Sequence, residues 1–335
     1  MIEVSHLTKR YGSHTAVKDL SFTIEKGVVY GFLGPNGAGK STTMNILTGC
    51  LGASEGEVKI DGHSIVEEPA QAKKLIGYLP EIPPLYPEMT ADEYLHFVAS
   101  AKGVPLKERD KQVRAAMDKT KITDVRNRLI RNLSKGYKQR VGIAQALIGD
   151  PEVIILDEPT VGLDPAQIIE IRELIRELGR DHTMVLSSHI LSEVQAVCDS
   201  IMIISHGELV ASDTPENLTT LFAGRTTYEM LVRADEEAAQ KTVEKVENVE
   251  SAVYAASEED AVRITITPAQ DNDLREALFY AFAEAKQPIL EMTRRRASLE
   301  DVFLELTQEK PREEQAKRKR LRKKAEKPEK EVEEE

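Results

Sequence analysis

The chain has 335 residues, 41% of them hydrophobic and 30% charged, with a net charge of −12. This length exceeds one ordinary domain of about 100–200 residues, so we expect two folded units with a sizeable core. The negative charge argues against broad nucleic-acid binding, and no nucleic-acid partner is expected. The sequence has no run of about 18 apolar residues, so the chain is not expected to span a membrane. It also has no apolar signal core near the N-terminus, so it is not expected to be exported.

Both cysteines, Cys50 and Cys198, lack the spacing of metal ligands. We expect two buried free thiols in a reducing cytoplasm.

Short apolar runs alternate with amphipathic stretches over residues 1–220. Ala166–Leu178 is an amphipathic stretch with helical spacing of its apolar residues. Four apolar runs are typical of buried strands: Val28–Leu33, Val153–Leu156, Met184–Leu186 and Ile201–Ile204. Such alternation predicts an α/β fold with a largely parallel sheet covered by helices. Over about 82–150, helical patterns replace the strands, which indicates a helical insertion into this core.

A glycine-rich stretch, residues 34–42, matches the phosphate-binding pattern G-x-x-x-x-G-K-[ST] between the strand Val28–Leu33 and the helical stretch Thr42–Leu47. Its glycines let backbone N–H groups close around phosphates. Lys40 is expected to reach the β and γ phosphates of ATP, and the Ser41 hydroxyl to ligate Mg²⁺. The expected nucleotide-binding residues of this loop are Gly34, Pro35, Asn36, Gly37, Ala38, Gly39, Lys40, Ser41 and Thr42.

Two adjacent carboxylates, Asp157 and Glu158, end the apolar run Val153–Leu156. Successive side chains of a strand face opposite sides, so the two carboxylates can have different roles. Asp157 is expected to hold Mg²⁺. Glu158 is expected to polarise the attacking water as a general base, a contribution of about 10²–10⁴-fold in rate.

The segment Leu133–Arg140 precedes a helical stretch and reads L-S-K-G-Y-K-Q-R. Here the chain resembles the ABC ATPase family, whose signature usually reads L-S-G-G-Q. The resemblance implies that Ser134, Gly136 and the helix N-terminus behind them form a second anion site. In the family that site faces the γ-phosphate of ATP held by the other subunit. Lys135 and Tyr137 depart from the usual pattern.

Other positions acquire roles from the same resemblance. Asp164 resembles the residue that crosses the dimer interface, and His189 the one that contacts the γ-phosphate and positions water. Tyr11 resembles the aromatic that stacks on adenine, with Val17 beside it; an ordinary surface tyrosine is the alternative. The remaining histidines are expected to be structural or exposed: His6, His14, His63, His96, His182 and His206.

Glu81 occupies a position where the family usually has a glutamine that contacts Mg²⁺ and moves with the membrane partner. A carboxylate binds Mg²⁺ more strongly than an amide does, so Glu81 is a candidate metal ligand. It also adds negative charge near the γ-phosphate.

Residues 225–307 show a βαββαβ order, which predicts a small ferredoxin-like α+β accessory domain. Arg294–Thr307 resembles the closing helix of the drug-export and gliding-motility type of ABC ATPase. Residues 308–335 are almost all charged, and we expect a disordered tail. The alternative is a patch that touches anionic lipid or a partner.

Together the motifs imply a P-loop NTPase core, and the resemblance implies the ATP-hydrolysing subunit of an ABC transporter. One motif set per chain suggests a homodimer, closed by ATP, that powers a separate polytopic membrane permease, with export favoured. The chain would then lie at the cytoplasmic face of the cell membrane. One alternative is a soluble ABC ATPase acting on ribosomes or DNA, although the chain lacks a second phosphate loop and sustained heptads. Another is a regulatory module without turnover, although Asp157, Glu158 and His189 are all present.

Overall fold

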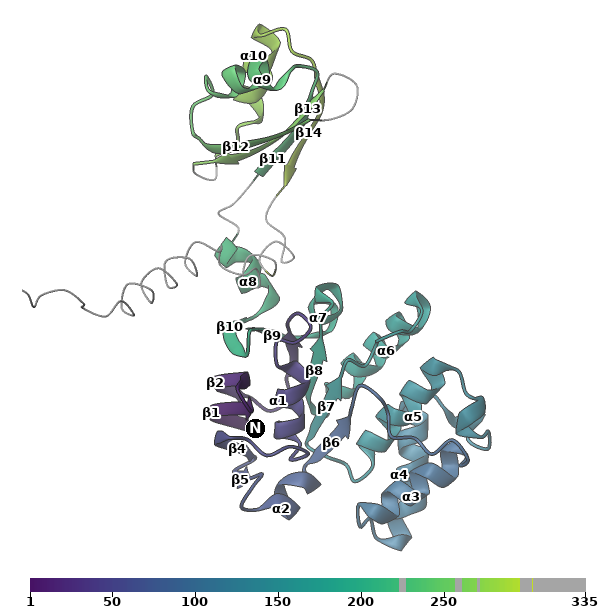
Figure 1. Ribbon diagram of the computed structural model, residues 1–335. Coiled ribbons are helices and arrows are strands. Elements are labelled where there is room, and N and C mark those ends of the chain that lie inside the picture. The colour runs from purple at the N-terminus through teal and green to yellow at the C-terminus, as the bar shows by residue number, and fades with distance from the viewer. Residues whose placement is uncertain (223–226, 257–260, 270–271, 296–302, 304–335) are drawn as a thin grey trace, which may run out of the picture.

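The computed structural model describes residues 1–222, 227–256, 261–269, 272–295 and 303 (Figure 1). Strands in this part of the chain form three sheets: a four-stranded sheet near the N-terminus, a six-stranded central sheet and a four-stranded sheet near the C-terminus. The first two belong to the part that carries the phosphate loop, the signature segment and the paired carboxylates.

The central sheet has the order β10-β9-β3-β8-β7-β6. It is parallel except for its edge strand β10, which runs antiparallel to β9. The expected α/β core with a largely parallel sheet is therefore confirmed. Its strands are β3 (Val29–Leu33), β6 (Ile76–Leu79), β7 (Val153–Asp157), β8 (Thr183–Ser188), β9 (Ser200–Ser205) and β10 (Glu208–Asp213).

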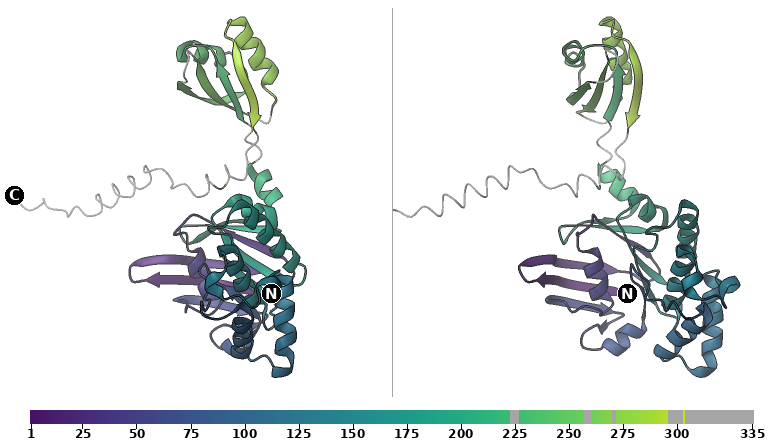
Figure 2. Two further views of the ribbon diagram at one scale, coloured as in Figure 1. Left: turned by 90° about the vertical axis from the view of Figure 1, so that its right-hand side faces the viewer. Right: turned by 45° about the vertical axis from the view of Figure 1, so that its right-hand side comes forward.

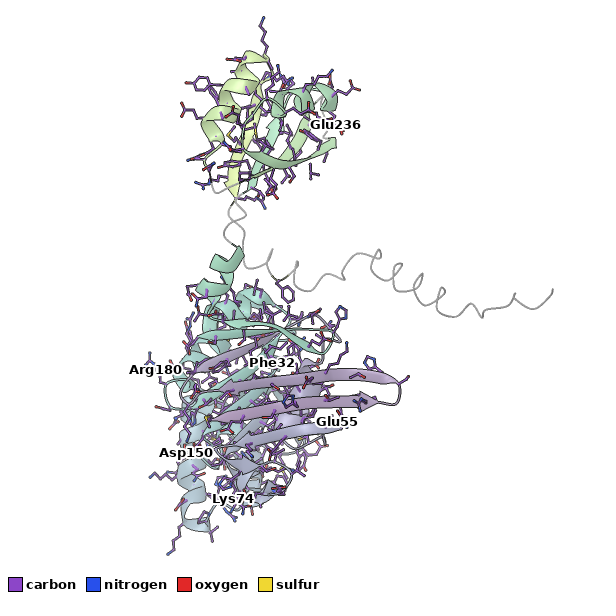
Figure 3. All side chains as sticks on the ribbon, turned by 90° about the vertical axis from the view of Figure 1, so that its left-hand side faces the viewer. Phe32, Glu55, Lys74, Asp150, Arg180 and Glu236 are labelled. Carbon is purple, nitrogen blue, oxygen red and sulfur yellow. The ribbon has the colours of Figure 1, made fainter. Side chains whose placement is uncertain are left out.

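A second, antiparallel sheet flanks the central one, in the order β2-β1-β4-β5. Helix α1 (Lys40–Leu47) lies between the two sheets in both Figure 1 and Figure 2. Side chains from both sheets and from α1 share one hydrophobic core, which includes the fully buried Phe32 labelled in Figure 3. The strands are β1 (Ile2–Tyr11), β2 (His14–Ile24), β4 (Glu55–Ile60) and β5 (His63–Ser64).

The other face of the central sheet is covered by helices, and a second core lies there. Three of these helices stand together beside the sheet in Figure 2, and they belong to the segment expected to be a helical insertion. They are α3 (Ala91–Ala101), α4 (Leu106–Lys119) and α5 (Lys135–Leu147). The remaining helices of this part are α2 (Pro69–Lys74), α6 (Pro165–Leu178), α7 (Leu191–Val197) and α8 (Pro215–Phe222), with 3₁₀ turns at Thr123–Val125 and Ile130–Asn132.

The C-terminal end of α5 is held by Lys102 from the turn after α3. The Lys102 ammonium donates to the carbonyls of Gln145, Ala146 and Ile148 at 3.2, 3.3 and 2.7 Å. Burial of the ammonium lowers the pKa of Lys102 to about 8. These contacts satisfy carbonyls that a helix end leaves without partners, and they fix the helix that carries the Leu133–Arg140 motif.

The C-terminal sheet has the order β12-β13-β11-β14, with every neighbouring pair antiparallel. Its strands alternate with two helices in the expected βαββαβ order, around a separate hydrophobic core. The elements are β11 (Thr227–Val232), α9 (Glu236–Val243), β12 (Val249–Ala256), β13 (Val262–Pro268), α10 (Arg275–Glu284) and β14 (Ile289–Arg295).

Most of the expected closing helix, Arg294–Thr307, and the whole charged tail, 308–335, lie outside the described residues. Phe303 is described, and it packs against the core on the helix-covered face of the central sheet. None of the helices in the described part of the chain has the length and hydropathy of a membrane span.

The cysteine expectation is half wrong. Cys198 is buried, and that burial raises the pKa of its thiol, but Cys50 is exposed. Cys50 lies in the turn after α1, where its backbone N–H donates to the Asn45 carbonyl while the side chain faces solvent.

Candidate functional site

A cavity of about 610 Å³ opens where the carboxyl ends of β3, β7 and β8 meet the antiparallel sheet. Ligands of open α/β folds bind outside the carboxyl ends of their strands, so the position is that of a functional site. The lining residues are Tyr11, His14, Ala16, Asn36, Gly37, Gly39, Lys40, Ser41, Thr42, Glu81, Glu158, Val161 and His189. Four other residues that sequence analysis singled out do not line the cavity: Gly34, Pro35 and Ala38 belong to the loop between β3 and α1, and Asp157 ends β7.

Two glycines shape the loop between β3 and α1. Gly37 and Gly39 have φ angles of 80° and 103°, in the left-handed region that glycine adopts without strain. A Cβ at Gly39 would lie 2.5 Å from the carbonyl oxygen of Ala16, whereas one at Gly37 would meet nothing within 4 Å. Gly39 is therefore required by the close approach of β2, and Gly37 leaves the backbone open toward the cavity.

Lys40 begins α1 and is only 6% exposed. Its ammonium donates to the Gly34 carbonyl at 2.8 Å and lies 3.5 Å from Glu158 Oε1. A buried cation held at the N-terminus of a helix provides a strongly anion-attracting floor for the cavity. The loop and this lysine thus fit the phosphate chain of a nucleotide.

Asp157, at the end of β7, accepts hydrogen bonds from the hydroxyls of Ser41 at 3.3 Å and Ser187 at 2.5 Å. Burial raises the pKa of Asp157, and these two hydrogen bonds oppose the shift. Within the described residues no group of three or more His, Cys, Asp or Glu side chains could hold a metal. One hydroxyl and one carboxylate are nevertheless the kind of oxygen ligands that Mg²⁺ takes alongside phosphate oxygens, so Ser41 and Asp157 fit that ion.

Glu158 turns the other way, into the cavity. Its φ of 49° places this residue in the left-handed region, which a non-glycine residue adopts at a cost, and its N–H donates to Ser187 Oγ at 3.0 Å. Glu158 Oε2 lies 2.9 Å from His189 Nδ1. Because a carboxylate only accepts, Nδ1 carries the hydrogen in this contact. The strained turn therefore aims one carboxylate of the pair at Lys40 and His189 and leaves Asp157 facing Ser41.

The mouth of the cavity differs in detail from the sequence expectation. Tyr11 lines it and is 49% exposed, but Val17 is fully buried in the core. Ala16 and His14 line the cavity where Val17 was expected. The cause is a bulge: Lys9 pairs with Val17 and the next residue pairs with Thr15, which leaves Ala16 as the extra residue. Val17 therefore does not line this cavity, and its expected place beside a bound adenine stays a prediction.

The signature residues lie away from this cavity. Ser134 is exposed and caps α5, its hydroxyl accepting from the Tyr137 N–H at 3.3 Å. Asp164 is exposed and caps α6 in the same way, accepting from the Gln167 N–H at 2.9 Å. A Cβ at Gly136 would come 2.6 Å from Gln167 Oε1, so the end of the Gln167 side chain lies against the backbone of this glycine.

Glu81, which follows β6, lines the cavity and also a neighbouring groove of about 600 Å³ at the base of the helical segment. This groove joins apolar residues of the loop after β6 to the N-terminal end of α5. Its lining residues are Glu81, Ile82, Pro83, Leu85, Pro87, Ile130, Arg131, Lys135, Lys138, Gln139 and Val161.

Fold and cavity together define a phosphate-loop nucleotide hydrolase. Residues 17–161 match the family model described as ABC transporter. The linearmycin resistance ATP-binding protein LnrL of Bacillus subtilis is 33% identical over 92% of this chain and 98% of its own length. The bacitracin transport ATP-binding protein BcrA of Bacillus licheniformis is 32% identical over 91% and 97%.

Solved structures agree. A dimeric structure of MJ0796, a bacterial ABC transporter cassette, has a TM-score of 0.59 at 28% identity over 64% of this chain and 98% of that one. An ATP-binding subunit of an ABC transporter has a TM-score of 0.60 at 30% identity, covering 66% of this chain and 93% of its own. The chain belongs to the family of ABC transporter ATP-binding proteins, and it is an ATPase.

Proposed function

We propose that two copies of this chain close head-to-tail over two Mg·ATP and reopen after hydrolysis. The observation that carries this proposal is the separation of the motifs within one chain. Lys40 and Glu158 line the cavity, whereas Ser134 and Asp164 cap exposed helix ends outside it. Helix N-termini with free N–H groups attract anions, so the ends of α5 and α6 offer a phosphate contact to a nucleotide held by a second copy.

The residues in and beside the cavity then have separate roles in turnover. Lys40 and the loop hold the phosphates, and Tyr11 stacks on the base. Bound Mg²⁺, held by Ser41 and Asp157 with Glu81 as a further candidate, would neutralise phosphate charge. Glu158 accepts a proton from the attacking water, and His189 orients Glu158 through the 2.9 Å contact.

The closing and reopening of the two copies drive a separate polytopic membrane permease at the cytoplasmic face of the cell membrane. The groove beside Glu81 is the proposed docking surface, because it combines exposed apolar side chains with direct continuity to the cavity. Ile82 at its rim is 81% exposed. Export is favoured because the similar LnrL is named for linearmycin resistance and BcrA for bacitracin transport.

Ile82→Glu is expected to lower recovery of the permease about tenfold when the tagged chain is purified from detergent-solubilised membranes of its own cells. A charge placed in an apolar contact must be desolvated without a partner. The measurement is the amount of polytopic membrane protein, identified by mass spectrometry, per amount of chain. Leu106→Glu, on the equally exposed Leu106 of α4, is the matched control and should recover the permease normally. Undiminished recovery with Ile82→Glu, or ribosomal proteins in place of a membrane protein, would contradict the docking proposal while leaving the ATPase intact.

A further inference from the structure

Glu193, in the first turn of α7, is a buried carboxylate that the roles above leave unused. It is 4% exposed. Its Oε2 accepts the hydroxyl of Thr160 at 2.5 Å and the hydroxyl of Ser188 at 3.0 Å. A buried carboxylate is costly unless it is hydrogen-bonded, and here two donors from separate segments converge on one oxygen.

The two donors flank the catalytic pair. Thr160 lies two residues after Glu158, and Ser188 lies one residue before His189. Both hydroxyls are themselves buried, and Ser188 Oγ also accepts the N–H of Ile190 at 3.0 Å. Glu193 therefore ties the turn that follows β7 to the last residue of β8.

Helix α7 holds the backbone of Glu193 in place. A Cβ placed on Gly31 of β3 would lie 2.0 Å from the Val194 side chain, so α7 sits directly against the central sheet. Val194 and Leu191 are buried on the same helix. The carboxylate also lies near the positive end of α7, which stabilises its charge.

We propose that Glu193 is a positioning residue for ATP hydrolysis. Its carboxylate sets the separation of the Glu158 and His189 turns, and so preserves the 2.9 Å hydrogen bond between those two side chains. Glu158 has a strained backbone at φ 49°, which needs surrounding structure to hold it. Small displacements of a catalytic base lower the rate of chemistry more than they lower substrate binding. Neither Glu193 nor Thr160 lines the cavity, so substrate affinity does not depend on them.

The test is steady-state hydrolysis by the purified full chain, with ATP affinity measured separately by titration with a fluorescent ATP analogue. Glu193→Ala is expected to lower kcat about tenfold and to leave KM and the analogue Kd within about twofold. Glu193→Gln is expected to keep at least about half of kcat, because one amide oxygen has two lone pairs and can accept both hydroxyls. Ser192→Ala, at the exposed neighbouring position, is the matched control and should behave as the wild type.

Thr160→Val gives a second, milder readout that survives even if Glu193→Ala does not fold. It removes one hydroxyl at nearly constant volume and should lower kcat about threefold. Combined with Glu193→Gln, the loss from Thr160→Val should persist; combined with Glu193→Ala, it should vanish, because the shared contact is already lost. Three outcomes would each overturn the proposal. The first is a wild-type kcat in Thr160→Val, and the second is a Glu193→Gln variant as inactive as Glu193→Ala. The third is a loss of activity in these variants that appears equally in KM.

Discussion

Glu158→Gln is expected to lower ATP turnover by about 10²–10⁴-fold while ATP still binds, the range that a general base contributes. The glutamine keeps the volume of the side chain and can still accept from His189 Nδ1, but it cannot take a proton from water. Because hydrolysis no longer reopens the closed form, this variant should accumulate with bound ATP. Phosphate release and retained nucleotide are the two measurements.

The control is Glu177→Gln, which removes an equal charge from the exposed face of α6 and should leave turnover unchanged. If Glu158→Gln hydrolysed ATP at the wild-type rate, Glu158 would not be the base, and the proposed division of work between Asp157 and Glu158 would fail.

Lys40→Met is expected to weaken ATP binding by about 10–150-fold and to abolish measurable turnover. Hydrogen bonds to a charged group are worth about 1.5–3 kcal/mol, and each 1.4 kcal/mol is about a tenfold change in affinity. Lys40 is buried at the cavity floor, so water does not replace the lost cation. Methionine preserves the length of the side chain, which separates the loss of charge from the loss of packing.

Titration with a fluorescent ATP analogue measures the affinity. Lys111→Met, an exposed lysine of α4, is the matched control and should bind normally. Unchanged analogue affinity in Lys40→Met would mean that the phosphates lie elsewhere.

Much of the site could be read from sequence because its chemistry is local. A glycine-rich turn between an apolar run and a helix, and two acids at the end of another run, each determine their own geometry over a few residues. The structure accordingly brings Lys40, Glu158 and His189 to one cavity and places Ser41 against Asp157.

The sequence was less informative where geometry depends on contacts between distant segments. The bulge that substitutes Ala16 for Val17 arises from the pairing of β1 with β2, and no local pattern marks it. The antiparallel sheet was missed because its strands, half exposed and polar on one face, lack the continuous apolar runs of the central sheet. Glu193 carried no signal either, because its partners Thr160 and Ser188 are 33 and 5 residues away.

The signature segment shows both limits at once. The sequence places the segment Leu133–Arg140 before a helical stretch, whereas the helix already begins at Lys135 within the segment, since Ser134 itself supplies the cap. Gly136 lies against the side-chain end of Gln167 in α6, a contact between two helices that spacing alone cannot reveal.

In the proposed dimer, each hydrolysis site combines the phosphate loop of one copy with the signature of another. The most direct test of this arrangement mixes two inactive variants, Lys40→Met and Ser134→Arg, in equal amounts and measures ATP hydrolysis. A mixed dimer contains one site with both defects and one site that is native. Random pairing makes half of the dimers mixed, so activity should recover to about a quarter of the wild-type value. A mixture no more active than the two variants measured separately would contradict the composite site.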